Sequence, residues 1–245
     1  MMIIKYVGSK SRISKYIVPI LQRIIDQNHI AAYYEPFVGG ANIIDKISCH
    51  KRYGYDINPY LIALFQNGEL VKTLSDEITA EEYKAVRSAY QNQSEQYPNW
   101  YTGAIGFLAS YNGKFFGGRA GMTHTKIGTV RNYYDEAKRN FLSQLPFLKD
   151  VQFEVSDYRA LQFEPNSLIY CDIPYSGTTG YEEVFDHKAF WDWAEEMSKD
   201  NYVVVSEQTA PSGWKSIWST PVKRTLDNNS RSTAVENLYQ CTITK

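Results

Sequence analysis

The residues best suited to chemistry lie where a predicted strand ends, in the sequence Asp172-Ile173-Pro174-Tyr175. The stretch 167–171 before it is apolar and β-prone, and a proline cannot continue a ladder, so the strand is predicted to end at Asp172. A carboxylate, a backbone carbonyl and an aromatic ring therefore meet at the carboxyl end of a strand. Open α/β sheets bind their ligands at that edge.

This set of groups is suited to the transfer of a methyl group to an exocyclic amine on a flat ring. The lone pair of such an amine is delocalised into the ring, which makes the nitrogen a poor nucleophile. Asp172 and the carbonyl of Ile173 can accept the two amine hydrogens and relocalise that lone pair, while Tyr175 stacks on the ring. An Asp before a Pro also caps many ordinary strands, so this stretch alone does not establish the reaction.

A second predicted ligand-binding feature is the stretch 33–42, which has the pattern of a strand, a glycine turn and a helix start. Gly39 and Gly40 allow the backbone to approach a ligand closely. The next strand ends at Asp56, which is placed to bind the hydroxyls of a ribose. Because the pattern Gly-x-Gly-x-x-Gly is absent, these residues indicate a nucleoside-bearing cofactor other than a nicotinamide dinucleotide.

Five short motifs follow one another over most of the chain. They are Lys5–Lys10, Glu35–Gly40, Asp56–Asn58, Ser156–Tyr158 and Cys171–Tyr175. Together they resemble the Dam-like DNA adenine-N6 methyltransferases, which use S-adenosylmethionine. In that family the corresponding segments are an amino-terminal cofactor motif, a methionine-binding glycine motif, a ribose-binding Asp-x-Asn, an Asp-aromatic pair near the cofactor adenine, and the catalytic Asp-Pro-Pro-Tyr. The combination is specific, whereas any one motif is not.

The resemblance implies S-adenosylmethionine as the cofactor, double-stranded DNA as the partner and adenine-N6 methylation as the reaction. The target adenine has to leave the duplex first, because its amine is otherwise paired and stacked. Catalysis is then expected of Asp172, Ile173, Pro174 and Tyr175, and no metal ion is expected to take part. Such an enzyme belongs to a restriction–modification system, a phage or a host regulatory pathway.

The resemblance also implies contacts for each part of the cofactor. Lys10 is expected near the methionine carboxylate, Asp56 at the ribose and Asp157 at the exocyclic amine, with Tyr158 or Ile57 beside the adenine ring. The expected cofactor-binding residues are Tyr6, Lys10, Glu35, Pro36, Phe37, Gly39, Asp56, Ile57, Asp157, Tyr158 and Asp172.

Ile173 departs from the family pattern, in which the second position is Pro. The backbone carbonyl is kept, while the fixed φ of Pro is lost and an N–H is gained. Activity is expected to survive with a less rigid loop, and a non-catalytic relative that binds DNA or cofactor is one alternative. A cytosine-N4 methyltransferase, which uses the same chemistry, is another. Asp172 argues against a glutamine methylase, which typically has Asn at this position.

Charge is segregated along the chain, although its net value is only −1. Residues 1–25 carry Lys and Arg but no acid, residues 111–140 are also mainly basic, and residues 69–82 and 182–196 are acidic. A positive face suits phosphate binding, although solvated helix faces produce the same pattern.

The segment 111–119 combines aromatic, amide and basic groups with glycines, which suits contacts to base edges and phosphates from a flexible backbone. The expected DNA contacts are Asn112, Lys114, Arg119 and Arg131. The aromatic residues Tyr111, Phe115 and Phe116 are expected in the core. A second segment, 176–181, is small and polar and is expected to close over the flipped base.

Periodicity predicts an α/β fold with a mostly parallel sheet, an antiparallel C-terminal hairpin and an inserted, mainly helical lobe. The resemblance implies that this fold is of the S-adenosylmethionine-dependent methyltransferase (Rossmann-like) type. Strands are predicted near 32–37, 52–56, 151–155, 167–172 and 201–206, helices over 9–28, 131–145 and 186–199, and a hairpin from 220–226 and 236–244. Pro19 is expected to start or kink a helix. The resemblance further implies that residues 1–59 and 151–245 form the catalytic domain and that residues 60–150 are the inserted target-recognition domain.

Composition is consistent with this organisation. The 245 residues, 43% of them hydrophobic, suffice for one α/β domain with a large insertion, and the 20 tyrosines suit a core as well as stacking on bases. Three distant cysteines and four scattered histidines indicate neither a disulfide framework nor a zinc site. No signal peptide is evident, and no apolar run reaches the ~18–20 residues of a membrane span. A cytoplasmic monomer, in a bacterial or phage-infected cell, is expected.

Overall fold

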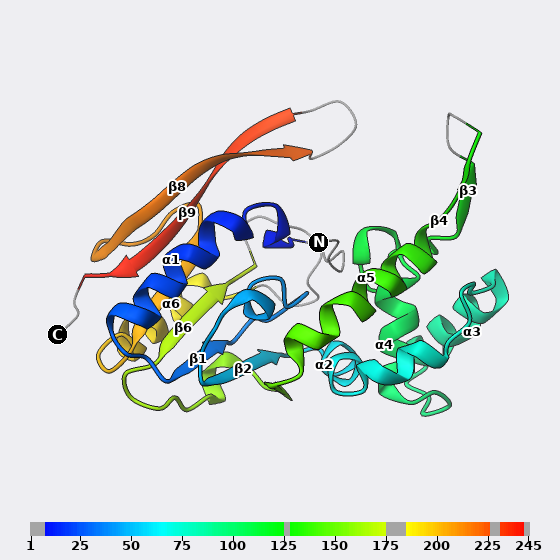
Figure 1. The fold of residues 1–245 in the computed structure, drawn as a ribbon, viewed down its shortest axis with the longest axis horizontal. Helices are drawn as coiled ribbons and strands as arrows, with labels where there is room; N and C mark the ends of the chain where they lie inside the picture. The colour runs from blue at the N-terminus through cyan, green and yellow to red at the C-terminus, as the bar shows by residue number, and fades with distance from the viewer. Residues whose placement is uncertain (1–7, 125–127, 175–184, 226–230, 243–245) are drawn as a thin grey trace.

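The computed structural model describes residues 8–124, 128–174, 185–225 and 231–242, with only the backbone described for 222–225 and 231–234. In these residues one sheet of seven strands is formed, in the spatial order β5-β2-β1-β6-β7-β9-β8 (Figure 1). Its strands are β1 (Ala32–Glu35), β2 (Lys51–Asp56), β5 (Val151–Val155), β6 (Leu168–Asp172), β7 (Tyr202–Glu207), β8 (Trp214–Thr225) and β9 (Arg231–Cys241).

Five of these strands are parallel, and β9 joins β7 and β8 in antiparallel fashion. The predicted fold class, a mostly parallel sheet with an antiparallel C-terminal hairpin and helices, is thereby confirmed. The hairpin is longer than predicted. Its outer part, from the pair Thr220↔Glu236 to the pair Thr225↔Arg231, extends beyond the end of β7.

Alternate residues of the central strands pack on opposite faces of the sheet, as the period of two in a strand requires. Tyr33 and Tyr170 belong to the core on the face covered by α1 (Ser14–Gln27). Ile169, Cys171 and Val205 belong to the core on the other face, which α6 (His187–Met197) covers. Both helices are visible on either side of the sheet in Figure 1.

Helix α1 continues through Pro19, which was expected to start or kink a helix. The helix buries Ile17, Leu21 and Ile25 on one stripe, whereas Pro19 lies on the exposed side. Water can satisfy the carbonyl that loses its partner there, so burial of the apolar stripe outweighs the cost of the proline. The short helix η1 (Lys10–Arg12) precedes α1.

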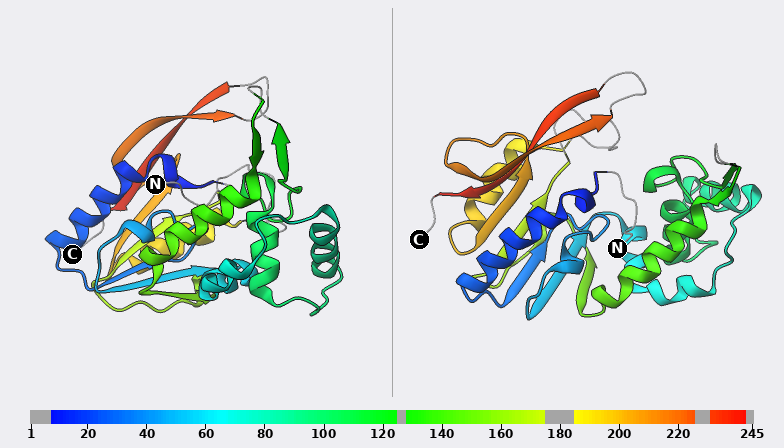
Figure 2. Two further views of the ribbon diagram at one scale, coloured as in Figure 1. Left: turned by 45° about the vertical axis from the view of Figure 1, so that its right-hand side comes forward. Right: turned by 45° about the horizontal axis from the view of Figure 1, so that its top comes forward.

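The chain between β2 and β5 forms a lobe beside the sheet (Figure 1). Its described elements are α2 (Pro59–Gln66), η3 (Gly68–Thr73), α3 (Ala80–Gln91), α4 (Asn99–Leu108), η4 (Tyr111–Gly113), β3 (Met122–His124), β4 (Val130–Asn132) and α5 (Tyr133–Leu148). The hairpin β3–β4 projects from this lobe on the same side of the molecule as the C-terminal hairpin, as Figure 2 shows.

Helix α4 was not among the predicted helices, and its glycines explain why. A Cβ atom on Gly103 would lie 2.1 Å from the carbonyl oxygen of Tyr60, and one on Gly106 would lie 2.2 Å from the ring of Phe115. These glycines therefore allow α4 to pack closely against α2 and the following loop, although glycine is a poor helix former in isolation. The remaining short helices are η2 (Ile44–Lys46) and η5 (Tyr158–Ala160).

Candidate active site

The predicted site residues come together at the carboxyl edge of the parallel strands. Strand β1 pairs with β2 on one side and β6 on the other, so the turn after Glu35, the end of β2 at Asp56 and the end of β6 at Asp172 lie along one edge. This is the arrangement that the sequence predicted for a ligand site in an open α/β sheet.

Asp172 forms an ion pair with Lys10 at this edge. Lys10 Nζ lies 2.6 Å from Asp172 Oδ1 and 3.3 Å from Glu236 Oε1 of β9. The side chains of Lys10 and Glu236 are each 4% exposed, whereas that of Asp172 is 23% exposed. The lysine predicted to approach the cofactor carboxylate is therefore held by the predicted catalytic acid.

Two hydrogen bonds fasten the glycine turn to the end of β2, and a third orients the Asp56 carboxylate. The amide of Val38 donates to the carbonyl of Tyr55 at 2.8 Å. The amide of Gly39 donates to Asp56 Oδ2 at 3.3 Å, and the amide of Asn58 donates to Asp56 Oδ1 at 2.9 Å. Gly39 has a φ of +46°, a conformation that glycine adopts without strain.

A further hydrogen bond joins two of the motifs. Asn42 Nδ2, just after the glycine turn, donates to Ser9 Oγ at 2.8 Å. Ser9 caps η1, in which Lys10 is the first residue. The amino-terminal motif and the glycine motif, which are 30 residues apart in sequence, therefore form one structural unit.

Both strand-end carboxyls are less acidic than ordinary aspartates. Burial raises the pKa of Asp172 to about 6, and the nearby Lys10 ammonium opposes this rise. Burial also raises the pKa of Asp56 to about 6, against the hydrogen bonds from Asn58 and Gly39. Each carboxyl is therefore largely ionised near neutral pH and becomes neutral in mild acid.

The residues predicted to bind the cofactor adenine lie in different environments. Ile57 is 66% exposed beside Asp56, so its apolar side chain is available to a planar ring. Tyr158 is 7% exposed and packs against Phe37 and Trp193 in the core. Of the two candidates for the ring contact, the structure favours Ile57.

Asp157, predicted to accept from the adenine amine, forms an ion pair with Arg159. The distance from Arg159 Nη2 to Asp157 Oδ2 is 2.6 Å, and this hydrogen-bonded pair lowers the pKa of Asp157. An amine donor at this position has to share the carboxylate with the guanidinium or displace it.

Glu35 and Ile173 stand at this edge with buried side chains, so these side chains contribute to its packing. Glu35 is 3% exposed and accepts a hydrogen bond from the Tyr33 hydroxyl at 2.7 Å. Burial raises the pKa of Glu35 well above its usual range. Ile173 is 2% exposed within the core cluster on the α6 side. Pro36 is also buried, whereas Phe37 and Pro174 are half-buried.

Tyr6, Tyr175 and the predicted closing segment 176–181 lie outside the described residues. Their expected roles in binding the cofactor and the target base remain predictions.

The predicted DNA-contacting residues lie on the lobe, and two of them have structural partners. Arg119 Nη1 donates to the carbonyl of Ile78 at 2.8 Å and holds the 111–119 segment against the start of α3. Arg131 forms an ion pair with Glu136 at 2.5 Å, and its guanidinium lies over the ring of Tyr133. Asn112 and Lys114 are exposed.

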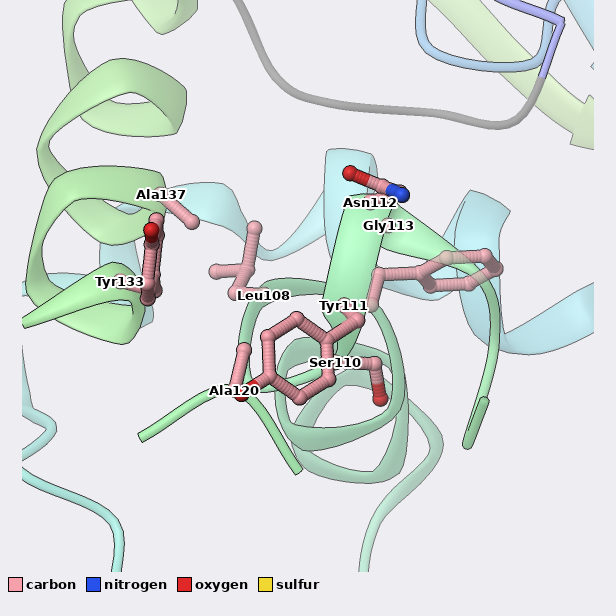
Figure 3. Close-up of a pocket in the computed structure, with 9 residues that line it drawn as sticks. Leu108, Ser110, Tyr111, Asn112, Gly113, Ala120, Tyr133 and Ala137 are labelled. Atoms are coloured by element: carbon pink, nitrogen blue, oxygen red, sulfur yellow. The ribbon is translucent and has the colours of Figure 1, made fainter. Parts of the chain in front are cut away.

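The segment 111–119 is ordered by backbone hydrogen bonds, and it borders a pocket of about 140 Å³ (Figure 3). Asn112 stands at one side of this pocket with a φ of +55°, while Tyr111 and Tyr133 form its walls. Of the aromatic residues expected in the core, Phe116 is buried, Phe115 is half-buried and Tyr111 is 51% exposed. The expectation of a core position for Tyr111 was wrong.

Three polar residues at or near this edge were not identified from the sequence. Glu236 and Ser206 are brought to Lys10 only by the pairing of β9 with β7, which local sequence does not reveal. Gln144 of α5 is fully buried and donates to the carbonyls of Gly40 and Ala41. An amide on the apolar stripe of a predicted helix was a signal that could have identified it.

Among the described residues, no group of three or more His, Cys, Asp or Glu side chains is arranged to hold a metal ion. Within the same part of the chain, no helix has both the length and the apolar character needed to cross a membrane.

Comparisons with known proteins identify the family to which the chain is similar. The model of the D12 class N6 adenine-specific DNA methyltransferase family matches residues 6–210. The type II methyltransferase M.FokI of Planomicrobium okeanokoites is 28% identical over 213 residues, and the match covers 78% of this chain but only 31% of that protein.

Two solved structures are distantly similar. The rRNA methyltransferase aviRa from Streptomyces viridochromogenes has 12% sequence identity and a TM-score of 0.45, with 94% of this chain and 84% of that chain covered. The 23S rRNA methyltransferase ErmE has 12% identity and a TM-score of 0.36, with 91% and 68% covered. The family match spans most of the sequence, and the chain therefore belongs to the D12 class N6 adenine-specific DNA methyltransferases, as the order of its motifs predicted.

Proposed function

We propose that this chain transfers a methyl group from S-adenosylmethionine to the N6 amine of an adenine in double-stranded DNA. The observation that carries the proposal is the ion-paired Asp172 at the end of β6, on the same edge as the Gly39–Asp56 turn. Family membership supports both the reaction and the cofactor. The similarity to a type II methyltransferase supports a place in a restriction–modification system.

The edge of the sheet suits a cofactor that carries both a nucleoside and a positive charge. Asp56 has the position and the ionisable carboxylate to accept from ribose hydroxyls, and exposed Ile57 offers an apolar surface to the adenine ring. Lys10, Asp172 and Glu236 together carry a net charge of −1 when ionised, which favours a sulfonium cation nearby. When bound, S-adenosylmethionine supplies an electrophilic methyl group.

Asp172 and the carbonyl of Ile173 then accept the hydrogens of the adenine amine. This raises the electron density on the nitrogen and stabilises the positive charge that develops there during the attack. The methylated ammonium is acidic and loses its extra proton readily, so Asp172 need not be a strong base. Positioning and electrostatics supply most of the catalysis.

Packing of the Ile173 side chain restrains the backbone at the position where the family has a proline. This side chain is buried against the α6 side of the core, which restrains the backbone directly after Asp172. The carbonyl that accepts from the amine is thus held by burial where the family uses a fixed φ.

The remaining parts of the proposal concern the DNA. The target adenine is flipped out of the duplex and stacks on Tyr175, at a cost of a few kcal/mol for unpairing and unstacking. Residues 60–150 act as the target-recognition domain and contact DNA through Asn112, Lys114 and Arg131, while 1–59 and 151–245 form the catalytic domain. The protein acts as a monomer in the cytoplasm of a bacterial or phage-infected cell.

Transfer of labelled methyl from S-adenosylmethionine to unmethylated genomic DNA, followed by nucleoside digestion and mass spectrometry, tests the proposal. N6-methyladenine is the expected product. N4-methylcytosine would keep the chemistry and overturn the base assignment. Cofactor binding without any methylated base would indicate the non-catalytic alternative.

A further inference from the structure

The C-terminal hairpin places a buried carboxylate, Glu236, beside the candidate catalytic residues. Glu236 lies on β9, outside the segment 6–210 that matches the family. Its Oε1 atom is 3.3 Å from Lys10 Nζ, and its side chain is only 4% exposed. Burial of a carboxylate costs free energy unless a cation pairs with it, and Lys10 is a cation that pairs with Glu236.

The position of Glu236 is set by the neighbouring strand β7. Ser206 of β7 donates from Oγ to Glu236 Oε1 at 2.7 Å. Ser206 is fully buried and stands opposite Asp172 in the β6–β7 ladder. Next to Glu236, the side-chain amide of Asn237 donates to the carbonyl of Gln208 at 2.8 Å and ties β9 to the end of β7.

Three segments that are distant in sequence thus converge on one ammonium group. Lys10 of η1 lies between Asp172 of β6 and Glu236 of β9, and both carboxylates approach the same Nζ atom. With Asp172 alone, the full charge of the lysine would act on the catalytic carboxylate. The second carboxylate, Glu236, fixes the ammonium from another side, and its negative charge opposes the effect of the lysine on the Asp172 carboxyl.

We propose that Glu236 is a positioning residue for methyl transfer, which together with Ser206 holds the Lys10 ammonium against Asp172 Oδ1 and leaves Oδ2 to accept from the amine. This inference rests on the proposed function, which it deepens. Glu236 itself does not touch the substrate and acts through Lys10.

The effect of removing Glu236 on the pKa of Asp172 depends on the charged and titratable groups around Asp172. They are Lys10 of η1, Glu236 of β9, Glu35 of β1, and Tyr170 and Cys171 of the same strand. The negative charge of Glu236 raises the pKa of Asp172, and Lys10 lowers it. Neutralising Glu236 therefore lowers the pKa of Asp172 and moves the acid limb of the rate to lower pH.

The test compares Glu236→Gln with wild type in methyl transfer to unmethylated genomic DNA. We expect kcat to fall about 10- to 100-fold, because a slightly misplaced acceptor has a large effect on rate, while KM for DNA and the Kd of S-adenosylmethionine stay within about twofold. We also expect the acid limb to shift to lower pH, and Glu236→Asp to recover part of the lost rate. A purely structural role would lower the folded fraction and leave the acid limb in place.

Glu164→Gln is the matched control. Glu164 forms an exposed ion pair with Lys51 at the start of β2, away from the carboxyl edge, and its loss should leave kcat unchanged. If Glu236→Gln does not fold, Ser206→Ala takes its place, with a smaller fall in kcat expected. A folded variant of either kind with wild-type kcat and an unshifted acid limb would overturn the inference.

A carboxyl ¹³C NMR titration of Asp172 separates this inference from the proposed function. If wild type transfers no methyl group, the proposed function fails, and the titration still decides the role of Glu236. A lower Asp172 midpoint in Glu236→Gln, with no change in Glu164→Gln, supports the coupling. Identical midpoints in all three proteins would overturn it.

Discussion

In the proposed mechanism, Asp172 has to be ionised to accept a hydrogen from the target amine. The rate of methyl transfer should therefore depend on pH in the range where Asp172 titrates. Because burial raises its pKa to about 6, the neutral form prevails below that pH and the carboxylate above it. We expect the single-turnover rate to rise with pH through about 6 and to fall by roughly tenfold per pH unit below it.

Saturating cofactor is needed in that measurement, because the pKa of Asp56 is also raised to about 6. Protonation of Asp56 should weaken cofactor binding over the same range, and a separate Kd titration detects it. A saturated rate that does not vary between about pH 5 and pH 8 would remove Asp172 from the chemical step.

Ile173 gives a second prediction at the residue scale. Replacing this buried side chain by Ala should lower the free energy of unfolding by about 2–4 kcal/mol and loosen the loop that carries the catalytic carbonyl. Ile173→Pro restores the family residue and should retain kcat within severalfold of wild type. Urea unfolding and single-turnover rates on both variants test this. A large loss of rate in folded Ile173→Pro would mean that this loop is built differently from that of the family.

Among the elements, α5 connects the lobe directly to the glycine turn. Gln144 donates to the carbonyls of Gly40 and Ala41 at 3.2 and 3.0 Å and to Asp45 Oδ2 at 3.1 Å. Gln144→Ala leaves these buried acceptors without that donor, so we expect a loss of about 1–3 kcal/mol in stability and a weaker affinity for the cofactor. Gln22→Ala of α1, which removes a half-buried amide that hydrogen-bonds to Asp26 and Ser48, serves as control for the cofactor affinity. Unchanged affinity in Gln144→Ala would show that the turn keeps its shape without the lobe.

The segment 111–119 allows positioning of the loop to be separated from contact with DNA. Lys114 is exposed, so Lys114→Ala should weaken DNA binding uniformly and reduce the salt slope by about 1. Arg119 is tied to the carbonyl of Ile78, so Arg119→Ala should mainly lower the melting temperature. Equal salt slopes for wild type and Lys114→Ala would place the DNA elsewhere on the lobe.

At the scale of the whole molecule, the sheet and the lobe share one core. The cluster on the α1 face continues from Ile17 through Leu61 and Ile105 to Phe141 of α5. Helix α5 runs from the lobe towards the sheet, which is visible in Figure 1. The lobe is therefore held in a defined position relative to the carboxyl edge, which the proposed target-recognition role requires.

The strands β6 and β7 were predictable from sequence because each is a short apolar run that ends at a polar residue. Thus β6 was predicted over 167–172 and spans Leu168–Asp172. The lobe was less predictable, since Gly103 and Gly106 serve close packing within α4 rather than a turn. The hairpin β3–β4 is exposed along both strands and has no apolar alternation that would reveal it.

The candidate site was also only partly predictable from the sequence. Asp56, Gly39 and Asp172 follow strands, so the edge that they share could be derived from local sequence. Glu236 and Ser206 depend on the pairing of three strands, and their approach to Lys10 is a property of the tertiary structure alone. Sequence also gave no indication that Lys10 would pair with Asp172.

Single-turnover methyl transfer by wild type and by Asp172→Ala, with the Kd of S-adenosylmethionine measured in parallel, tests the central role of Asp172 most directly. Asp192→Ala, which removes an exposed carboxylate paired with Lys188 on α6, is the control. We predict that wild type and the control form N6-methyladenine at equal rates, while Asp172→Ala is slower by at least about 10²- to 10³-fold and still binds the cofactor. Equal rates in Asp172→Ala and wild type would contradict the mechanism.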